Sequence, residues 1–537
     1  MSNTMRCLSE ILDFLNFLEF KKLSHLALLS TPLQYKRELT DNFESISLDS
    51  KKCTSNSIFV ALKGLSCDGN DYIENVIVKG VKLVLTDSNK ELPQITSLPK
   101  IIFVPNLKDK IADIAQWFYN YKKPRNVIGI TGTNGKTSIS NYIAQFLSLD
   151  NSQTLLLGTN GNGIYPNLLE STHTTLDAFS LYEMITKYQD KALPYSPLGM
   201  GVNRRGVVST TAMSSTSTSL SNPEGKFTSL VMEVSSHSLD QERTKGLDFD
   251  VAVFSNLTLD HLDYHKTMEN YFLAKAKLFQ SDRLKHSIIN IDDDYGKRLV
   301  QLAKGKVVTV SLLDDTADIY LQVLDIENMF TSFVLYDSCK KIGKYKTSLL
   351  GSFNLMNLAL SVAALKSNYS FKAILKSIDI IEPVKGRMEV IALKKKAQII
   401  IDYAHTPDAL ENVLKTLQQY NPSKLLCIFG CGGNRDTSKR AIMASIAEKY
   451  ADNVIVTEDN NRLENIESIF TDIKKGFEKP TEHLFIDSRE DAIKYAIDNA
   501  ERGDIILLAG KGHECYLDKK GVKEYFDERE VIDRYNH

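Results

Sequence analysis

The stretch TGTNGKTS, residues 131–138, combines residue types and spacing that favour one kind of chemistry, the binding of phosphate. It follows the apolar run Val127 to Ile130, and a helical pattern begins near Lys136. In a glycine loop between a strand and a helix, backbone N–H groups point at one locus and attract phosphate, while a lysine ammonium balances its charge. The hydroxyl of Thr137 or Ser138 would then hold magnesium. We therefore predict a nucleotide site at this loop.

The loop is a variant of the best-known phosphate-binding motif. The strict P-loop pattern has a glycine five residues before Gly135, and this chain has Ile130 at that position. A plain glycine turn between a strand and a helix is the alternative interpretation. The combination of Thr131, Asn134 and Lys136 is not needed for a turn, so it favours the nucleotide site.

Carboxylates and imidazoles gather in two further stretches, VMEVSSHSLDQER (231–243) and SNLTLDHLDYH (255–265). Each begins at the end of an apolar strand, where an α/β sheet places its ligand crevice. The side chains suited to binding a hard cation and to proton transfer are Glu233, His237, Asp260, His261, Asp263 and His265. A satisfied pair of His261 and His265 on one helix face is an equally good interpretation, and the sequence contains no HExxH zinc spacing.

Two helical patterns carry candidate side chains for which a structural role is the simplest interpretation. YFLAKAKLF (271–279) contains Lys275 and Lys277, which would be surface lysines on composition alone. The pattern that opens with GSFNLMNLALSVAAL (351–365) places Asn354 and Asn357 on one face, where helix capping is the alternative role. The residue pattern alone assigns neither pair to a site.

The C-terminal third contains five polar stretches, several of which follow an apolar strand and contain glycines that permit close backbone approach. These stretches are GRME (386–389), IDYAHTPDAL (401–410), FGCGGNRDTSKR (429–440), EDNNR (458–462) and AGKGHECY (509–516). GCGGNR lacks G-x-G-x-x-G spacing, so by itself it is weak evidence for a dinucleotide site.

The elements that must position these residues follow an α/β pattern. Short β-rich apolar runs alternate with longer helical patterns, which predicts largely parallel sheets. The strand candidates are 58–62, 81–85, 101–104, 127–130, 230–234, 251–254, 288–291, 399–401, 425–429, 454–457 and 505–508. Polar, proline-containing stretches at 119–126 and 381–389 suggest three domains, 1–123, 124–383 and 384–537. Residues 190–226 are predicted to form a flexible insertion, because most of them are Ser, Thr, Gly and other residues that bury little surface.

Composition excludes several classes of protein. The chain of 537 residues has a formal net charge of -2, so no global field attracts it to nucleic acid or to an anionic membrane. The N-terminal residues lack the pattern of a signal peptide, and no uncharged apolar run is long enough to span a bilayer, so we expect a cytoplasmic protein. Seven cysteines without a CxxC pair predict buried free thiols rather than disulfides or a zinc ribbon.

Taken in order, the motifs resemble those of the Mur ligase family, the ATP-dependent amide-bond ligases of peptidoglycan synthesis. The resemblance covers nearly the whole chain outside residues 190–226 and is closest to the diaminopimelate-adding members. It rests on LDSKKCTSNSIFVALKG, TGTNGKTS, MEVSSHSLDQER, NLTLDHLDYH, AHTPDAL, FGCGGNRD and GKGHE. It implies an α/β fold of three domains: an N-terminal UDP-substrate-binding domain, a central P-loop-type ATPase domain with a mostly parallel sheet, and a C-terminal Rossmann-like domain that binds the amino acid.

The resemblance also implies a role for each candidate residue. The UDP-muramoyl dipeptide would be bound by Leu48, Ser50, Leu65, Ser66, Cys67, His173, Thr174, Thr175, Ser235, Gln241 and Arg243. ATP would be bound by Gly132, Thr133, Asn134, Gly135, Lys136, Thr137, Ser138, Asn354, Asn357, Arg387, Asp402 and His405. Magnesium would be held by Thr137, Ser138, Glu233, His261 and Lys275, the last as an anionic carbamate formed with CO2. The catalytic set implied is Lys136, Glu233, His261, Lys275, Arg387 and Asp402.

The implied reaction joins a carboxylate to an amine. The D-glutamate γ-carboxylate would attack the ATP γ-phosphate, and the incoming amine would then displace phosphate from the acyl phosphate. Lys136 and two magnesium ions would offset the repulsion between the two anions. Domain closure would exclude water from the acyl phosphate.

The incoming amino acid is implied to be meso-diaminopimelate, and its expected ligands are Arg435, Asp459, Asn460, Asn461, Arg462, Gly510 and Glu514. The family's diaminopimelate enzymes carry D-N-P-R, whereas this chain has Asn461 in place of the proline. Arg462 would bind the distal carboxylate and Glu514 the distal ammonium, and lysine has no such carboxylate.

Three other functions remain as alternatives. They are an L-lysine-adding ligase of the same family, a folylpolyglutamate synthetase-like ligase and an ATP-binding module without catalysis. The second would not be expected to carry the N-terminal LDS to FVALKG segment, and the third would not need Lys275, His261 and Arg387. We expect a monomer that binds small-molecule substrates, without nucleic acid and without a membrane span.

Overall fold

The computed structural model describes residues 5–22, 42–64, 67–88, 100–150, 152–171, 174–189, 227–327, 329–394, 397–434 and 436–536. The predicted insertion at 190–226 lies outside these residues. The chain divides into two compact units. One comprises Met1–Thr131, Asn151–Val251 and His261–Lys285, and the other comprises Gly132–Asp150, Ala252–Asp260 and His286–His537.

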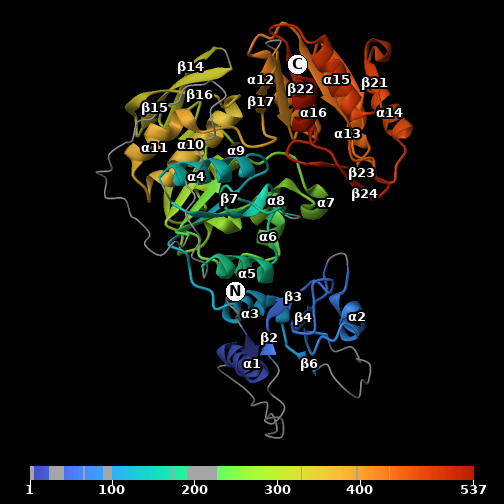
Figure 1. Ribbon diagram of the computed structural model, residues 1–537. Helices are drawn as coiled ribbons and strands as arrows, with labels where there is room; N and C mark the ends of the chain where they lie inside the picture. Colours follow the sequence, from blue (N-terminus) through green and yellow to red (C-terminus); the bar gives the residue numbers. More distant parts are fainter. Residues whose placement is uncertain are drawn as a thin grey trace. The chain divides into compact units, whose positions relative to one another are not determined.

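The N-terminal part of the first unit is built on a parallel sheet of order β3-β4-β5-β6 (Figure 1). Its strands are β3 (Ser45–Ser47), β4 (Ser57–Ala61), β5 (Leu83–Thr86) and β6 (Lys100–Phe103). Its helices are α1 (Leu8–Lys22), α2 (Ile73–Val78) and α3 (Leu107–Phe118), and β1 (Arg6–Cys7) pairs with β2 (Asn42–Phe43). Alternate residues of β4 belong to two different core clusters, so this apolar strand is buried on both faces, as in other parallel sheets.

The remainder of the first unit contains four strands in the order β7-β10-β8-β9. They are β7 (Asn126–Thr131), β10 (Ser229–Glu233), β8 (Thr154–Gly158) and β9 (Gly161–Ile164), of which only β9 runs antiparallel to its neighbour. The helices of this part are α5 (Ala178–Gln189), α6 (Ser236–Asp240), α7 (Leu262–His265) and α8 (Met268–Ala276), followed by the 3-10 turn η3 (Lys277–Phe279). The carboxyl end of β10 carries Glu233.

The second unit begins with the helix that follows the glycine loop, α4 (Lys136–Leu149), which packs against α10 (Ser352–Lys366). Its strands β11 to β16 lie next to one another in sequence order. They are β11 (Val251–Phe254), β12 (His286–Asn290), β13 (Lys306–Ser311), β14 (Ile319–Glu327), β15 (Phe330–Asp337) and β16 (Lys340–Thr347). Helices α9 (Asp294–Val300) and α11 (Phe371–Ser377) complete this part.

The C-terminal part of the second unit is an α/β domain with the strand order β17-β18-β22-β19-β20-β21. All neighbours are parallel except β17. The strands are β17 (Glu389–Ala392), β18 (Gln398–Asp402), β19 (Leu425–Phe429), β20 (Asn453–Thr457), β21 (Leu484–Ile486) and β22 (Ile505–Ala509), with a hairpin of β23 (Tyr516–Lys519) and β24 (Val522–Tyr525). The helices are α12 (Pro407–Gln418), α13 (Ser438–Tyr450), α14 (Ile466–Lys474), α15 (Arg489–Asn499) and α16 (Glu528–Tyr535).

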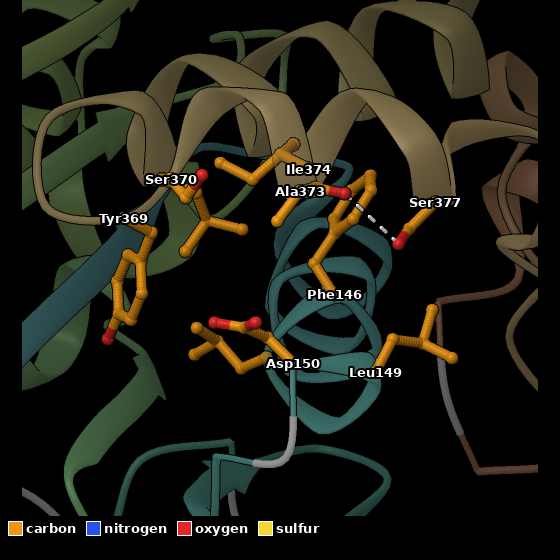
Figure 2. Close-up of a pocket in the computed structure, with 10 residues that line it drawn as sticks. Phe146, Leu149, Asp150, Tyr369, Ser370, Ala373, Ile374 and Ser377 are labelled. Atoms are coloured by element: carbon orange, nitrogen blue, oxygen red, sulfur yellow. Dashed lines mark hydrogen bonds between the residues drawn. The ribbon is translucent and has the colours of Figure 1, made fainter. Parts of the chain in front are cut away.

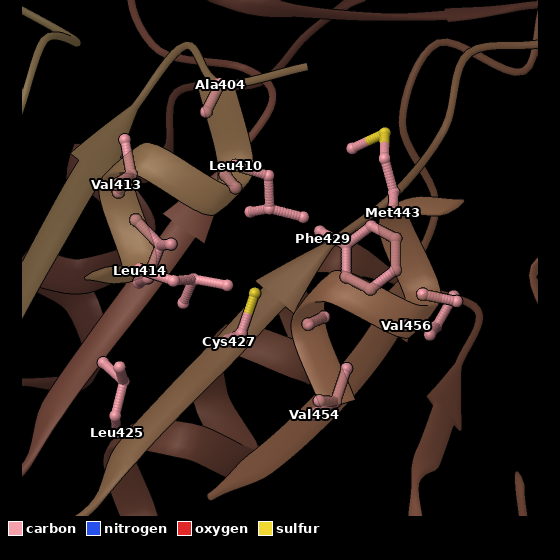
Figure 3. Packing of buried hydrophobic residues seen from close by; sticks show 14 of the residues in the cluster. Ala404, Leu410, Val413, Leu414, Leu425, Cys427, Phe429, Met443, Val454 and Val456 are labelled. Carbon is pink, nitrogen blue, oxygen red and sulfur yellow. The ribbon is translucent and has the colours of Figure 1, made fainter. Parts of the chain in front are cut away.

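This C-terminal sheet is covered by helices on both faces. One core cluster joins Cys427 and Phe429 of β19 to residues of α12, α13 and α14, as Figure 3 shows for Leu410, Leu414 and Met443. Another joins the intervening β19 residue, Ile428, to residues of α15 and α16. The two-residue repeat of a strand therefore explains why an uninterrupted apolar run fits here, since both of its faces are buried.

The expected α/β architecture is confirmed, and every predicted strand overlaps a strand of the structure. The expectation of largely parallel sheets is wrong for β14 to β16, which pair antiparallel. The expectation that the cysteines are buried is also wrong in part. All seven are free, but Cys67 and Cys339 are exposed and Cys7 and Cys515 are half-buried.

Candidate active site

The glycine loop before α4 has a shape that only glycine permits at two positions. Gly132 has φ +149° and Gly135 has φ +86°. A Cβ atom on Gly135 would lie 2.5 Å from Asn357 Oδ1, and one on Gly132 would lie 1.9 Å from Ser255 Oγ. Both glycines are therefore required for the chain to pass close to its neighbours.

The segment after β11 holds the backbone of this loop. The N–H groups of Thr133 and Asn134 donate to the backbone oxygen and to Oδ1 of Asn256, each over 2.9 Å. The Ser255 hydroxyl donates to the Asn134 carbonyl, and the Thr258 N–H donates to Thr133 Oγ1 over 3.0 Å. These bonds fix the loop in one conformation.

Lys136 is the first residue of α4, as the sequence predicts. Its ammonium donates to the carbonyl oxygens of Gly132 and Thr133, each over 2.9 Å, so it lies over the loop. Thr137 and Ser138 follow in the first turn and are buried. No side chain caps the start of this helix. A helix N-terminus with a lysine above a glycine loop is suited to binding phosphate.

Helix α10 brings two buried asparagines beside the loop. Asn357 faces Gly135, and its Nδ2 donates to Asn354 Oδ1 over 3.3 Å. The hydroxyl of Tyr142 in α4 also donates to Asn354 Oδ1, over 3.2 Å. The capping alternative does not apply, because the N-cap position of α10 is Gly351. The asparagines instead couple α10 to α4 and to the glycine loop before it.

In the first unit, Glu233 at the end of β10 is 1% exposed and is linked to Thr159. Its Oε1 accepts the Thr159 N–H over 2.8 Å, and its Oε2 accepts the Thr159 hydroxyl over 3.0 Å. A Cβ atom on Gly158 would lie 2.2 Å from Glu233 Oε1, so this glycine makes room for the carboxylate. Sequence reasoning missed Thr159, for which no motif gives a signal.

Three imidazoles and Lys275 lie together in the same unit. The His237 ring lies 4.9 Å from the His261 ring and 5.4 Å from the His265 ring, measured between centroids. Burial lowers the pKa of His237, and the neighbouring His261 lowers it further. The Lys275 ammonium lies 4.6 Å from the centroid of the Tyr271 ring. Its side chain is 1% exposed, which excludes the alternative of a surface lysine.

His261 and His265, which lie four residues apart in the sequence, have different environments in the structure. His265 lies within α7, is buried and shares a 3.0 Å hydrogen bond between its Nε2 and Ser236 Oγ, so the structural alternative describes it well. His261 precedes the helix with φ +54° and is exposed. Asp260 and Asp263 are exposed as well.

The expected dipeptide ligands of the first unit form one hydrogen-bonded group. Thr175 Oγ1 donates to the Glu233 carbonyl over 3.0 Å and accepts the Ser235 N–H over 3.0 Å. Arg243 donates to Gln241 Oε1 through Nε and Nη2, and to the Thr175 carbonyl through Nη1 over 3.2 Å. The Thr174 hydroxyl lies 3.2 Å from the hydroxyl of Thr159.

The structure shows fewer contacts for the other expected ligands of the UDP-muramoyl dipeptide. Leu48 and Ser50 follow β3, where both are half-buried, and Cys67 is exposed. The Ser50 carbonyl accepts a hydrogen bond of 2.7 Å from the Lys79 ammonium. Four predicted site residues lie outside the described part of the chain, namely Leu65, Ser66, His173 and Arg435.

In the C-terminal domain, Asp402 lies at the end of β18 and organises the turn that carries Arg387. Its two carboxylate oxygens accept the N–H groups of Met388 and Ala404, each over 2.8 Å. Burial raises the pKa of Asp402, and the Arg387 charge opposes that rise. The guanidinium carbon of Arg387 lies 4.6 Å from the centroid of the Tyr403 ring, and the buried Nε of Arg387 has no hydrogen-bond partner among the described residues.

Two rings that sequence reasoning missed complete this group. The Tyr403 ring lies 4.8 Å from that of His405 and 5.2 Å from that of His513, and His405 Nδ1 bonds the Tyr403 carbonyl over 2.9 Å. Burial lowers the pKa of His513 to about 4, and the Arg387 charge adds to this effect. Tyr403 lies within the motif IDYAHTPDAL and His513 within GKGHE, so their positions in these motifs could have identified both residues as candidates.

The expected amino-acid ligands come together at the ends of β20 and β22. Asn460 Nδ2 donates to Glu514 Oε2 over 2.9 Å, and a Cβ atom on Gly510 would lie 3.1 Å from Asp459 Oδ2. Arg462 has φ +52°, and its Nη1 donates to the Gly433 carbonyl over 2.9 Å. The structure thus groups Asp459 to Arg462 with Gly510 and Glu514, and it adds the buried Lys511, which the sequence analysis did not assign.

A separate pocket lies at the opposite end of α4 from the glycine loop (Figure 2). Phe146, Leu149 and Asp150 from α4 and its C-cap face Tyr369 and Ile374 across it. Burial raises the pKa of Asp150. None of the predicted site residues lines this pocket.

Two features are absent from the described part of the chain. No helix in that part of the chain is long and apolar enough to cross a membrane. No three or more His, Cys, Asp or Glu side chains within it form a group that could hold a metal ion. The expected metal ligands are consistent with the second finding, since only Glu233 and His261 among them are of these types.

Comparison with known proteins defines the class. Three domain profiles match in order: "Mur ligase family, catalytic domain" at residues 42–119, "Mur ligase middle domain" at 130–210 and 194–365, and "Mur ligase, glutamate ligase domain" at 386–512. The chain belongs to the Mur ligase family and is an ATP-dependent, amide-bond-forming ligase. The expected three-domain α/β fold is therefore confirmed.

Two individual ligases and one solved structure are similar to the chain over most of its length. The chain is similar to the UDP-N-acetylmuramoyl-L-alanyl-D-glutamate--2,6-diaminopimelate ligase of Fusobacterium nucleatum, at 38% identity over 92% of this chain and 94% of the relative. The ligase of the same name from Pseudomonas aeruginosa is 38% identical over 93% of this chain and 96% of its own. A solved structure of such a ligase has a TM-score of 0.62 and 34% identity, covering 92% of this chain and 96% of that chain.

Proposed function

We propose that this chain adds meso-diaminopimelate to the D-glutamate γ-carboxylate of UDP-N-acetylmuramoyl-L-alanyl-D-glutamate at the expense of ATP. The observation that carries the proposal is the 38% identity, over 92% of the chain, to a ligase named for these two substrates. The clustering of Asp459 to Arg462 with Glu514 at one edge of the C-terminal sheet supports an amino-acid site there.

In the first step, an oxygen of the γ-carboxylate attacks the γ-phosphorus of ATP, and the bond to the bridging oxygen breaks to release ADP. The product is an acyl phosphate. Lys136, now bonded to loop carbonyls, would turn its ammonium toward the phosphates, and the N–H groups at the start of α4 would bind the transferred oxygens. Thr175, Ser235, Gln241 and Arg243 would hold the dipeptide.

In the second step, the amine of diaminopimelate attacks the acyl carbon. A tetrahedral intermediate forms, phosphate leaves with the bonding electron pair, and the nitrogen loses a proton. Arg387 has a buried Nε without a partner and lies beside a neutral His513, so it is suited to bind an anionic phosphate oxygen. This role would explain why Asp402 holds the turn that carries Arg387.

The donor set fits magnesium. Within the first unit, Glu233 offers a buried carboxylate and His261 an exposed imidazole, and Lys275 would join them as a carbamate. Thr137 or Ser138 remains the proposed hydroxyl ligand of an ion bound with ATP. Burial lowers the pKa of both His237 and His265, and the Lys275 ammonium adds a small contribution in the same direction, which an anionic carbamate would reverse. When bound, the metal supplies positive charge that offsets the repulsion between carboxylate and triphosphate. Chelation of magnesium should therefore abolish turnover.

Selection of diaminopimelate would depend on its second chiral centre. Arg462 uses only Nη1 for bonds within the described chain, so the rest of its guanidinium can bind the distal carboxylate. Glu514 would bind the distal ammonium. L-lysine has the ammonium but lacks the carboxylate, so the account predicts that it is a poor substrate.

Because ATP and UDP-linked sugars are cytoplasmic metabolites, we place the enzyme in the cytoplasm and expect a monomer, which size-exclusion chromatography with light scattering can check. The function is tested by ADP release from the purified chain with ATP, magnesium and each combination of acceptor and amino acid. Release should require both the UDP-muramoyl dipeptide and meso-diaminopimelate. ADP release that does not depend on the acceptor would refute the ligase function and leave an ATP-hydrolysing or ATP-binding module.

A further inference from the structure

Lys511 is a fully buried lysine in the middle of the proposed amino-acid site. Its side chain is 0% exposed, and it lies in the loop after β22, between Gly510 and Glu514. Burying an ammonium carries a large desolvation cost unless the charge is paired, so its partners indicate its purpose.

The Lys511 ammonium contacts polar atoms of one residue on its own loop and of two on the loop after β20, and it lies 5.0 Å from the centroid of the Tyr516 ring. It donates to Glu514 Oε2 and to Asn460 Oδ1, each over 3.1 Å, and lies 3.6 Å from Asp459 Oδ1. Asn460 Oδ1 also accepts the Asp518 N–H over 2.9 Å. The ammonium therefore joins the two loops.

These contacts leave one face of the Glu514 carboxylate available. Oε2 accepts two bonds, from Lys511 and from Asn460 Nδ2. Oε1 accepts none from the described residues. A carboxylate whose first oxygen is fixed by two donors presents its second oxygen in one direction. Asn460, expected above to bind the substrate directly, instead uses its side-chain amide within the protein.

The charges of this cluster also match a single cation. Asp459 and Glu514 carry two negative charges and Lys511 one positive charge, which leaves a net charge of minus one. One substrate ammonium would neutralise it. Without Lys511, the two carboxylates would repel each other, and one would become easier to protonate.

We propose that Lys511 is a positioning residue that sets the affinity for the amino acid by orienting Glu514 toward its distal ammonium. This inference rests on the proposed function, because it assumes that the amino acid binds at Glu514. Asn460 acts with Lys511 as the second donor to the same oxygen. Neither side chain needs to contact the substrate.

The test uses the full-length enzyme and steady-state kinetics with each substrate varied in turn. Lys511→Met keeps the length of the side chain and removes its donors, and Lys519→Met is the matched control. Lys519 lies 2.8 Å from Glu458, and its side chain is 38% exposed. Lys511→Met should raise the KM for meso-diaminopimelate by about tenfold or more, the loss expected for one charge-assisted contact. The KM for ATP and the KM for the acceptor should change by less than about twofold, as should all constants of Lys519→Met.

A double-mutant cycle separates positioning from a general structural effect. If Lys511 acts through Glu514, the pair Lys511→Met and Glu514→Gln should be no worse than Glu514→Gln alone. Multiplied effects, an unchanged KM for diaminopimelate, or equal losses for all three substrates would overturn the proposal. If Lys511→Met does not fold, Asn460→Asp serves as the second variant, because its side chain has the same shape but repels Glu514 Oε2. Asn460→Asp must then raise the KM for meso-diaminopimelate. Absence of turnover in the wild type would instead refute the proposed function.

Discussion

At the residue scale, several polar side chains of the candidate site use only some of their hydrogen-bonding atoms within the described protein. Their other polar atoms are therefore available to a ligand. Lys136 lies on loop carbonyls, Arg462 uses one of its nitrogens, and Glu514 uses one of its oxygens. Arg387 has a buried Nε that no described residue hydrogen-bonds. Unpaired groups of this kind are costly in a folded protein, so they indicate where ligands bind.

Asn461, which replaces the proline of the family's D-N-P-R motif, gives the first prediction. Among the described residues, its buried Oδ1 has no hydrogen-bond partner and its N–H donates to none. Asn461→Pro should therefore leave the free energy of unfolding unchanged or raise it by up to about 1 kcal/mol, because proline restricts the unfolded chain. Denaturant unfolding would measure this. Asn460→Pro is the control and should destabilise, since the Asn460 N–H bonds Asp459 Oδ1. A loss of more than about 1 kcal/mol in Asn461→Pro would show that the native backbone rejects proline.

His513 gives a prediction for pH dependence. Burial, assisted by the Arg387 charge, lowers its pKa from 6.5 to about 4 in the folded chain. As pH falls from 6.5 toward 4, the unfolded chain takes up a proton that the folded chain does not, so stability is lost in that window. Between pH 7.5 and pH 5 the loss due to His513 is at most about 2 kcal/mol. His513→Gln should lose less stability than the wild type over this interval in urea unfolding. Parallel losses would show that His513 does not carry the effect.

At the element scale, the site depends on loops that meet where glycines allow backbones to touch. A Cβ atom on Gly386 would lie 2.2 Å from the carbonyl carbon of Gly512 and from the His513 nitrogen. The turn that carries Arg387 thus packs directly on the GKGHE loop. Spacing in the sequence could not reveal this contact, because the two segments are far apart along the chain.

Substitution of these glycines tests the contact. Gly386 and Gly521 have similar positive φ values, +72° and +80°, but nothing lies within 4 Å of a Cβ atom on Gly521. Gly521→Ala should therefore cost only the backbone strain, about 1 kcal/mol. Gly386→Ala should add the clash and cost about 3 kcal/mol or more. Thermal unfolding of both variants would measure the difference, and equal losses would mean that the two loops separate easily.

The elements also show how much the sequence could predict. Strands such as β11 and β19 match their predicted ranges, because a run of apolar residues buried on both faces gives a clear signal. The strands β14 to β16 were not among the predicted strands, although β15 contains the buried apolar run Phe333 to Leu335. β16 contains Lys340, Lys341, Lys344 and Lys346 and is mostly solvent-facing, so its composition is that of a polar segment.

Prediction of the candidate site depended on contiguous motifs, whereas prediction of the strands depended on apolar runs. The candidate residues of the glycine loop, and Gly510 and Glu514 of the GKGHE loop, were predicted because their motifs are contiguous. Thr159 and Lys511 were missed as functional residues, since their importance comes from contacts with distant residues, Glu233 in one case and Asn460 in the other. Contacts between side chains that are far apart in the sequence can be identified only from the folded structure.

At the scale of the whole molecule, recognition has to be local. The net charge of -2 provides no general attraction for the three anionic or zwitterionic substrates proposed here, so local side chains would have to select each of them. The chain matches its named relatives over more than nine-tenths of its length, which supports one function for the whole chain rather than for one domain.

The most direct test of this function is a competition between the two amino acids. The enzyme would be given ATP, magnesium, the UDP-muramoyl dipeptide and equal amounts of meso-diaminopimelate and L-lysine, and the UDP-linked product would be identified by mass spectrometry. The account predicts that nearly all product carries diaminopimelate, and that Arg462→Ala reduces this preference. A wild-type product that carries mainly lysine would contradict it.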